Sequence, residues 1–151
     1  MPTHPAPDDR DGFSFRSEVQ VRFRDLDAMN HVNNAVYMTY FEIARLAFWA
    51  AITGSDDVRA RGLILAEQTC TYRSPARFNE HLLVWIKPTA IRRSSFVYRY
   101  RIDEREYGRL IATGRSVQVA YDYETERVVP LPPELRAALE RAAGRPLPEE
   151  E

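Results

Sequence analysis

A short segment rich in aspartate and asparagine, residues 25–34, contains the side chains best suited to chemistry. It reads Asp-Leu-Asp-Ala-Met-Asn-His-Val-Asn-Asn. A carboxylate can attack a carbonyl or take a proton from water, and a histidine can polarise or position the attacking group. Asp and Asn also favour turns and helix N-caps. The segment is therefore predicted to be a loop that ends where a helix begins.

Each polar residue of this loop also has a structural role that its type alone would explain. Residue type by itself favours Asp27 as a turn residue that caps its own loop. Asp25 is expected to orient the loop or to pair with a nearby arginine. His31 could position the nucleophile or be fixed by backbone hydrogen bonds. Asn33 is expected to be the helix N-cap first and a substrate contact second.

A second candidate group is the run Arg92, Arg93, Ser94 and Ser95. Guanidinium groups match the geometry of phosphate oxygens, and short hydroxyls add hydrogen bonds. The alternative role for the same residues is a solvated turn between two strands. The sequence therefore leaves open whether this run binds phosphate groups.

The elements that must position these residues begin with a strand and a helix. Apolar and polar residues alternate at period two over residues 15–24, which predicts a strand. Over residues 35–52 apolar residues follow helical spacing on nearly all sides, and Gly54 is a suitable stop. Glu42 and Arg45, in the narrow polar stripe, are expected to form an i,i+3 ion pair. Such a helix is predicted to be buried.

The rest of the chain returns to period two and ends in a second helix. Four strands are predicted, at residues 63–73, 82–91, 95–103 and 109–122. Residues 104–108 are predicted to form a hairpin turn, and Pro132 and Pro133 to introduce an amphipathic helix over residues 134–143. This order predicts an α+β fold in which an antiparallel sheet wraps around the long helix. One sheet would leave part of that helix exposed, so we expect an oligomer.

Length and composition indicate a globular protein. The chain has 151 residues, of which 44% are hydrophobic and 28% are charged, near the averages for globular domains. The net charge is −1 and there is no sustained basic run, so nucleic acid is not expected as a partner. Cys70 is the only cysteine, which excludes an intramolecular disulfide and fits a reducing cytoplasm. It is expected to pack within its strand.

The two ends of the chain are expected to lie outside the domain. Residues 1–12 are predicted to be a disordered tail, residues 13–143 the domain, and residues 144–151 a flexible tail. The first twelve residues lack the apolar region of a signal peptide. The longest apolar run, residues 46–52, is far shorter than the ~20 residues that a membrane span needs. No membrane association is expected.

The loop and three further segments resemble one protein family. Residues 25–37 are similar to the active-site segment of the 4-hydroxybenzoyl-CoA thioesterase-like hotdog family, and His-Val-Asn-Asn resembles its acyl-CoA thioesterase branch. The resemblance continues through residues 40–45, Tyr-Phe-Glu-Ile-Ala-Arg, and residues 72–77, Tyr-Arg-Ser-Pro-Ala-Arg. It extends to Arg-Arg-Ser-Ser-Phe at residues 92–96. In all it covers about residues 18–139.

The resemblance implies a hotdog-fold enzyme that hydrolyses an acyl-CoA thioester. It implies that Asp27 is the catalytic carboxylate, acting as nucleophile or as general base. Backbone amides at the helix start, that of Asn34 above all, would form the oxyanion hole. His31 is a further candidate catalytic residue. The candidate substrate contacts are Asn33, Tyr37, Arg92, Arg93, Ser94 and Ser95.

Several alternatives to this interpretation stay open. Tyr37 and Tyr40 could line an acyl pocket or pack in the core. The thiol carrier could be an acyl carrier protein, or the chain could be a hotdog module that binds acyl groups without catalysis. No cofactor and no metal are expected. The expected assembly is a homodimer or homotetramer.

Overall fold

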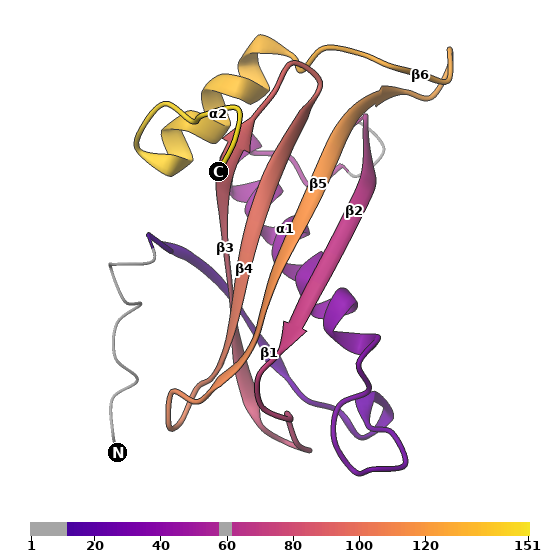
Figure 1. Ribbon diagram of the computed structural model, residues 1–151, viewed down its shortest axis with the longest axis vertical. Coiled ribbons are helices and arrows are strands. Elements are labelled where there is room, and N and C mark those ends of the chain that lie inside the picture. The colour runs from indigo at the N-terminus through magenta and orange to yellow at the C-terminus, as the bar shows by residue number, and fades with distance from the viewer. Residues whose placement is uncertain (1–11, 58–61) are drawn as a thin grey trace.

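The computed structural model describes residues 12–57 and 62–151, which form one antiparallel sheet with a long helix against it (Figure 1). The predicted N-terminal tail, residues 1–12, lies outside the described residues except for Gly12. The strand order is β1-β3-β4-β5-β2, and the short strand β6 pairs with β5. The strands are β1 (Phe15–Gln20), β2 (Leu63–Tyr72), β3 (His81–Ile91), β4 (Ser95–Glu104), β5 (Leu110–Asp122) and β6 (Arg127–Val128).

The long helix, α1 (Val36–Thr53), lies along one face of the sheet (Figure 1). Its buried side chains recur at helical spacing and are Tyr37, Tyr40, Phe41, Ala44 and Phe48. Phe41 packs so closely on β5 that a Cβ at Gly114 would lie 2.6 Å from its ring, a distance that only glycine avoids. Gly54 ends the helix with a φ of 74°. The predicted helix and its stop are confirmed.

The burial of α1 within one chain is one-sided, as expected for a helix that a single sheet covers. Ile43 is 40% exposed, and Met38, Leu46 and Trp49 are only half-buried. The cause is that a single sheet covers a single face of the helix. No helix among the described residues has the length and hydropathy needed to span a membrane.

The first strand ends earlier than predicted, at Gln20 instead of residue 24. The Arg22 N–H donates to the Asp25 carboxylate (3.0 Å), and residues Phe23–Asp25 form a 3-10 turn. Phe23, which the period-two pattern places on the core face, is consequently 78% exposed. The short-range hydrogen bonds of Asp25 therefore override the strand pattern.

The other predicted elements agree with the structure to within one residue at each end. The hairpin turn after β4 is confirmed, because the Glu104 N–H donates to the Arg109 carbonyl (2.8 Å). The second helix, α2 (Pro133–Ala143), buries Leu135 and Leu139. The alternation predicted for β4 does not separate buried from exposed residues, since the neighbours Val97 and Tyr98 are both buried.

The C-terminal segment, residues 144–151, lies beside α2 and ends near β3 (Figure 1). The Ile91 N–H of β3 donates to the Pro148 carbonyl (2.9 Å), and the Leu147 N–H donates to the Glu140 carboxylate (3.1 Å). The Glu151 carboxylate pairs with Arg99 and Arg115. The flexibility expected for this segment stays a prediction.

Candidate active site

Asp25 anchors the polar loop, residues 25–34. Its buried carboxylate accepts hydrogen bonds from the Arg22 guanidinium (3.0 Å) and the Tyr40 hydroxyl (2.9 Å), and its carbonyl accepts the Asn33 N–H (2.9 Å). Burial raises the pKa of Asp25, but the hydrogen bonds from Arg22 and Tyr40 outweigh burial and hold it below its usual range. Burial and the Asp25 carboxylate raise the pKa of Tyr40, so its hydroxyl stays a donor. The expected pairing of Asp25 with an arginine is confirmed.

Asp27 is half-exposed and is held by its own loop. Its Oδ1 accepts the Met29 N–H (2.8 Å), and its carbonyl accepts the Asn30 N–H (3.0 Å). Asn30 takes a left-handed φ of 66°, which allows the sharp turn. The other carboxylate oxygen, Oδ2, makes no hydrogen bond with any described residue. Asp27 therefore caps its loop with one oxygen and keeps the second available for chemistry.

His31 closes the same turn through its backbone. Its carbonyl accepts the Asp27 N–H at 3.0 Å, so backbone hydrogen bonds do fix this residue. Its side chain is half-buried and makes no hydrogen bond with the described part of the chain. A catalytic role for the imidazole stays a prediction.

The start of α1 includes a backbone donor, the Asn34 N–H, that has no partner among the described residues. Asn33 acts as a cap for the turn before the helix: its Oδ1 accepts the Ala35 N–H (2.9 Å) and its carbonyl accepts the Val36 N–H (2.9 Å). The helix N-cap itself is Ala35, so the predicted N-cap is displaced by two residues. The Asn34 N–H, between these bonded groups, makes no hydrogen bond with a described residue. This is the donor expected for the oxyanion hole.

Tyr72, at the end of β2, fixes the position of Asn34. Its hydroxyl donates to the Asn34 carbonyl at 2.7 Å, and its ring meets that of Tyr37 edge-to-face at 5.0 Å. Tyr37 is 2% exposed and its hydroxyl accepts the Ala76 N–H (3.3 Å). Tyr37 therefore packs in the core, and its contact with substrate stays a prediction. The sequence did not identify Tyr72 as a site residue, although Tyr72 begins the resembling segment at residues 72–77, because its contact with Asn34 spans 38 residues.

The second candidate group lies at the other end of the sheet. Gln20, which leads into the polar loop, pairs with His81 at the start of β3. The turn that contains Arg92, Arg93, Ser94 and Ser95 follows Ile91, the last residue of β3. Ten residue steps along β3 separate these ends by about 33 Å. The Arg92 Nε donates to the Glu149 carbonyl (3.1 Å). One chain therefore does not bring this turn to Asp27, and phosphate binding there stays a prediction.

A groove runs between α1 and the edge strand β2. One part, with a volume of about 360 Å³, is lined by Met38, Thr39, Glu42, Arg45, Leu65 and Gln68. A second part, of about 140 Å³, shares Glu42, Arg45 and Leu65 and reaches Trp49. From Met38 to Trp49 the helix rises about 16 Å. The groove therefore begins one helical turn beyond Asn34 and continues along α1.

Arg45 points to the sheet instead of to Glu42. Its Nη1 donates to the Gln68 side chain (2.7 Å) and the Tyr100 hydroxyl (3.3 Å), and no ion pair with Glu42 occurs among the described residues. The predicted i,i+3 pair is therefore wrong, because contacts with the sheet replace it.

Cys70 is half-buried, and burial raises the pKa of its thiol to about 11, as suits a packing residue.

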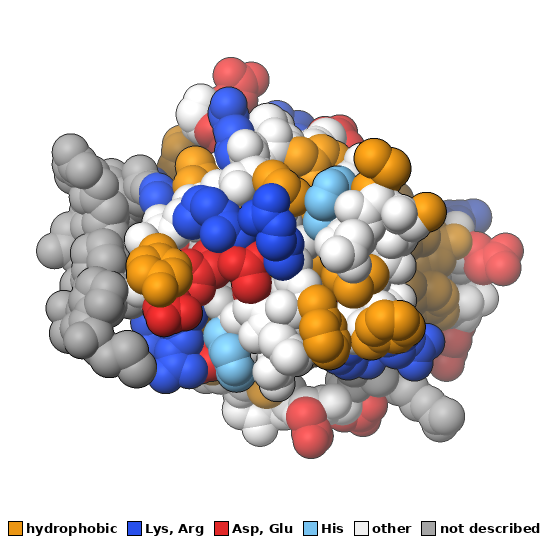
Figure 2. All heavy atoms as spheres, turned by 90° about the horizontal axis from the view of Figure 1, so that it is seen from below, with side chains coloured by type: hydrophobic (Ala, Val, Ile, Leu, Met, Phe, Trp, Pro, Cys, Tyr) orange, Lys and Arg blue, Asp and Glu red, His pale blue; other side chains and the backbone are white. Residues whose placement is uncertain are grey.

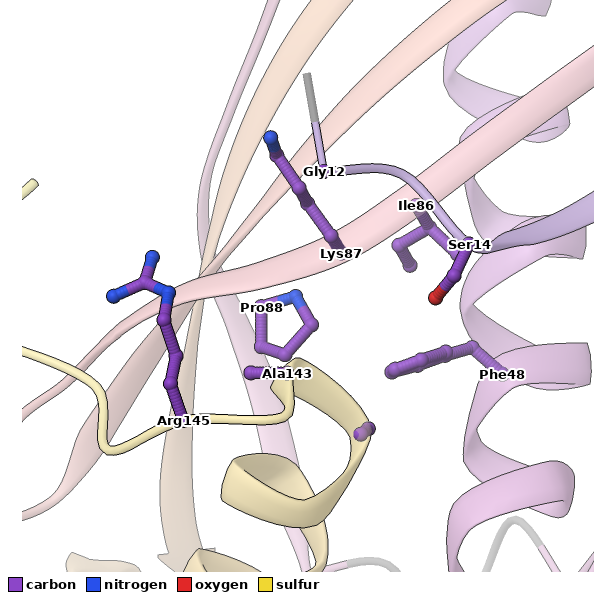
Figure 3. Close-up of a pocket in the computed structure, with 9 residues that line it drawn as sticks. Gly12, Ser14, Phe48, Ile86, Lys87, Pro88, Ala143 and Arg145 are labelled. Carbon is purple, nitrogen blue, oxygen red and sulfur yellow. The ribbon is translucent and has the colours of Figure 1, made fainter. Parts of the chain in front are cut away.

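A smaller cavity, of about 100 Å³, lies between β3, α1 and α2 (Figure 3). Phe48, Pro88 and Arg145 are among its lining residues, and none of the candidate site residues lines it. No group of three or more His, Cys, Asp or Glu residues suited to a metal ion occurs in the part of the chain that the structure describes.

The antiparallel sheet on a long helix, with a polar loop at the helix start, defines a hotdog-fold thioesterase. The chain matches the model of the thioesterase-like superfamily over residues 21–139, which include the polar loop and most of the sheet. The chain belongs to this superfamily, and it is a thioester hydrolase.

Two similar proteins, FadM and a Thermus thioesterase, agree with this assignment. The chain is 26% identical over 131 residues to the long-chain acyl-CoA thioesterase FadM of Escherichia coli, covering 83% of this chain and 97% of that protein. It is 29% identical over 117 residues to YsmA of Bacillus subtilis, covering 78% and 79% of the two chains. A thioesterase from Thermus thermophilus, solved with coenzyme A and Zn, is 32% identical with a TM-score of 0.81, over 90% of this chain and 98% of that chain.

Proposed function

We propose that this chain hydrolyses an acyl-CoA to the free acid and coenzyme A, with Asp27 as the catalytic carboxylate. The observation that carries the proposal is the pairing of two unengaged groups in one loop. The Asp27 Oδ2 and the Asn34 N–H make no hydrogen bond with a described residue, while the Asp27 Oδ1 and the N–H groups of Asn33, Ala35 and Val36 are bonded. The acyl-CoA substrate is supported by the similarity to FadM and to the Thermus thioesterase solved with coenzyme A.

Hydrolysis of a thioester requires little more than the Asp27 carboxylate and the Asn34 N–H. Its thiol leaving group has a pKa near the ~8.5 of cysteine and departs without strong acid catalysis. As general base, Asp27 takes a proton from water while the water oxygen bonds to the carbonyl carbon. The oxyanion forms against the Asn34 N–H, where the positive end of the helix dipole also favours it. The C–S bond then breaks, and the thiolate takes up the proton. As nucleophile, Asp27 would instead attack the carbonyl carbon and form an anhydride as the C–S bond breaks and the thiolate leaves, and water would then hydrolyse the anhydride.

The groove along α1 is the proposed site of the acyl group. It starts one helical turn from Asn34, and apolar side chains of both α1 and β2 line it, including Met38, Leu65 and Trp49. A thioester carbonyl held at Asn34 would direct the acyl group into this groove. Burial of apolar acyl surface there supplies about 25 cal/mol per Å².

A second copy of the chain is proposed to complete the enzyme as a homodimer. The strand β2 lies at the edge of the sheet and exposes Ile64 (41%), Leu65 (45%) and Tyr72 (41%). An exposed, apolar edge strand is a template for pairing with another chain. Pairing there would also cover the uncovered face of α1 and close the groove. Sedimentation that shows a folded, active monomer at micromolar concentration would contradict this assembly.

The function is tested by following free thiol release from a panel of acyl-CoA substrates and from the same acyl groups on acyl carrier protein. We expect release from acyl-CoA and none with the Asp27→Asn variant. Preferential hydrolysis of the carrier-protein series would replace coenzyme A by a carrier protein as the partner. No turnover of either series by the parent protein, together with tight binding of acyl-CoA, would identify a binding module instead.

A further inference from the structure

The end of the molecule that carries the polar loop exposes three large apolar side chains. Phe23 is 78% exposed, Met29 is 72% exposed and Phe78 is 49% exposed. Phe23 and Phe78 meet edge-to-face with their ring centroids 6.1 Å apart. Figure 2 shows this end, where hydrophobic and basic side chains lie side by side. We call Phe23, Met29 and Phe78 the apolar rim.

Backbone hydrogen bonds hold the two aromatic residues of the rim just beyond the ends of β1 and β3. The Val21 N–H donates to the Glu80 carbonyl (2.9 Å), and the Asn79 N–H donates back to the Val21 carbonyl (3.2 Å). These two bonds continue the pairing of β1 with β3 past its last residues. Phe23 follows this extension on one side and Phe78 precedes it on the other. Regular backbone structure therefore supports both side chains.

The homodimer proposed above leaves the apolar rim uncovered. Pairing through β2 extends the sheet sideways, at right angles to its strands, and covers the exposed side of α1. The rim lies instead beyond the strand ends, in the turn after β1, in the polar loop and in the loop before β3. None of its residues belongs to β2 or to α1. We therefore expect the rim to stay exposed in the assembled enzyme.

Two arginines without partners among the described residues border the rim. Arg24 follows Phe23, and Arg77 precedes Phe78. Both are exposed, and neither side chain makes a hydrogen bond or ion pair with a described residue. The neighbouring carboxylates already pair with other arginines, in the ion pairs Asp25–Arg22 and Glu80–Arg109. Each aromatic side chain of the rim is therefore next to a guanidinium that is available to an anion.

The size of the rim favours a lipid surface over a protein partner. At about 200 Å² for a fully exposed side chain of this size, the three side chains offer about 400 Å² of apolar surface. Each partner of a stable protein complex buries about 800 Å², with complementary shape. A bilayer requires no complementary shape, because protruding apolar side chains enter the boundary between headgroups and acyl chains. Arginines beside them stay with the anionic headgroups.

We propose that the apolar rim, with Arg24 and Arg77, is a reversible contact with a membrane surface that contains anionic phospholipid. The apolar side chains enter the acyl boundary, and the two guanidiniums bind lipid phosphate groups. The Met29 N–H donates to the Asp27 carboxylate (2.8 Å), so the contact holds the candidate active site at the bilayer surface. This proposal departs from the expectation of no membrane association. That expectation rested on apolar runs in the sequence, whereas only the fold brings Phe23 and Phe78 together.

The test is flotation of the full chain with phosphatidylcholine vesicles, with and without phosphatidylglycerol. The parent should bind the vesicles that contain phosphatidylglycerol, and less so as the salt concentration rises. The double variants Phe23→Ala/Phe78→Ala and Arg24→Ala/Arg77→Ala should each lose about ten-fold or more in affinity. The variant Phe23→Leu/Phe78→Leu keeps the apolar surface and should bind nearly like the parent. It separates the loss of an apolar contact from a failure to fold.

The chain offers a matched control for each kind of side chain. Tyr107 is also 72% exposed at this end of the sheet, but its N–H donates to the Glu104 carboxylate (2.9 Å), and no unpaired arginine adjoins it in the sequence. Tyr107→Ala should leave the affinity for the vesicles unchanged. Arg127→Ala/Arg141→Ala removes two exposed arginines elsewhere and should also leave it unchanged.

Several results would overturn the proposal. They include no binding of the parent to the phosphatidylglycerol vesicles, equal binding by the parent and both double variants, and an equal loss in Tyr107→Ala. A changed sedimentation coefficient of the Phe23→Ala/Phe78→Ala variant would make the rim a contact between copies of the chain. A loss of turnover confined to carrier-protein substrates would make it a docking surface for a protein.

Vesicle binding is measured without substrate, so the membrane contact and the proposed hydrolysis fail independently. If the parent hydrolyses acyl-CoA but does not bind the vesicles, only the membrane contact fails. If the parent binds the vesicles through the rim but hydrolyses no thioester, only the hydrolytic function fails. In the absence of vesicles, kcat and KM for a short-chain acyl-CoA should be the same in the parent and in both double variants. A raised KM under these conditions would make the rim a substrate contact instead.

Discussion

The two ends of the sheet differ in what their polar groups do. At the end with the polar loop, the Asp27 Oδ2 and the Asn34 N–H make no hydrogen bond with a described residue, although both are held in place. At the other end, the turn after β3 and the C-terminal segment bind each other. The Arg92 Nε donates to the Glu149 carbonyl (3.1 Å), and Arg136 donates to the Arg92 carbonyl (2.8 Å). We infer from this difference that the end with the polar loop is the one that acts on a ligand.

The same contrast appears between two carboxylates only two residues apart. Asp25 is buried and its oxygens bind Arg22 and Tyr40, whereas Asp27 is half-exposed and binds its own loop through one oxygen. The first carboxylate holds the loop, and the second is the one that we propose to react. Substitution of each by asparagine should therefore separate stability from activity.

The largest expected effect is the loss of turnover in Asp27→Asn. Asparagine keeps the size and turn preference of aspartate and can still accept the Met29 N–H, so the thermal melting temperature should stay near that of the parent. It cannot act as a base or nucleophile, and general-base catalysis alone supplies about 10²–10⁴-fold. The measurement is kcat on the best acyl-CoA of the panel. A variant that melts like the parent and retains most of its kcat would refute the mechanism.

Asp25→Asn should instead lower stability. Asparagine loses charged hydrogen bonds to Arg22 and Tyr40, of which the one to the buried Tyr40 hydroxyl is worth about 1.5–3 kcal/mol. The folded-state pKa of Asp25 lies below its unfolded value, so its ionised form stabilises the protein at neutral pH. That contribution is lost as the pH falls below about 4, through the folded-state pKa. Urea unfolding at pH 7 and at pH 3 measures both effects. An equal difference in stability between parent and variant at the two pH values would contradict the role of Asp25.

Local signals explain which parts of the fold could be predicted from the sequence. The helix α1 and its end at Gly54 follow from apolar spacing and a residue suited to left-handed φ, and α2 follows from its prolines. Short-range hydrogen bonds of Asp25 end β1, and this end could not be predicted because the Tyr40 hydroxyl, fifteen residues further on, also holds the Asp25 carboxylate in place. The partner of Arg45 was missed for the same reason, since Gln68 and Tyr100 come from distant strands.

The candidate site also contains some residues that local sequence signals predict and others that they do not. Asp27 and the Asn34 amide come from one continuous segment, so a motif could place them in a single loop. Tyr72 reaches that loop only through the pairing of strands. The distance between Asp27 and Arg92 is set by the topology of β1 and β3, which no short motif contains. Sequence patterns therefore identify the reacting segment better than they identify its supports.

Tyr72→Phe should reduce kcat/KM by a few-fold to about ten-fold. The lost hydrogen bond to the Asn34 carbonyl is worth about 0.5–1.5 kcal/mol, and the Asn34 N–H would be less firmly placed for the oxyanion. Tyr123→Phe is the matched control, because the Tyr123 hydroxyl also donates to a backbone carbonyl, that of Leu63, at 2.8 Å. The control should lose a similar free energy of unfolding and keep its kcat/KM. Equal losses of kcat/KM in both variants would remove Tyr72 from the site.

The smallest expected effect is that of Glu151→Gln, at the end of the sheet opposite the polar loop. The Glu151 carboxylate pairs with Arg99 and with Arg115, the latter at 2.7 Å. Burial raises the pKa of Glu151, but the two arginines outweigh burial and lower it, so the group is ionised at neutral pH. Partly exposed ion pairs are each worth about 0–1 kcal/mol, so the free energy of unfolding should fall by about 1 kcal/mol in low salt and by less at high salt. Turnover of acyl-CoA should not change, since these contacts are remote from the polar loop.

The control for Glu151→Gln is Glu150→Gln. Glu150 is an exposed neighbour that forms no ion pair with a described residue, so its substitution should alter neither the free energy of unfolding nor turnover. A loss of kcat in Glu151→Gln without a loss of stability would show that the two ends of the sheet are coupled, against the division of roles described above.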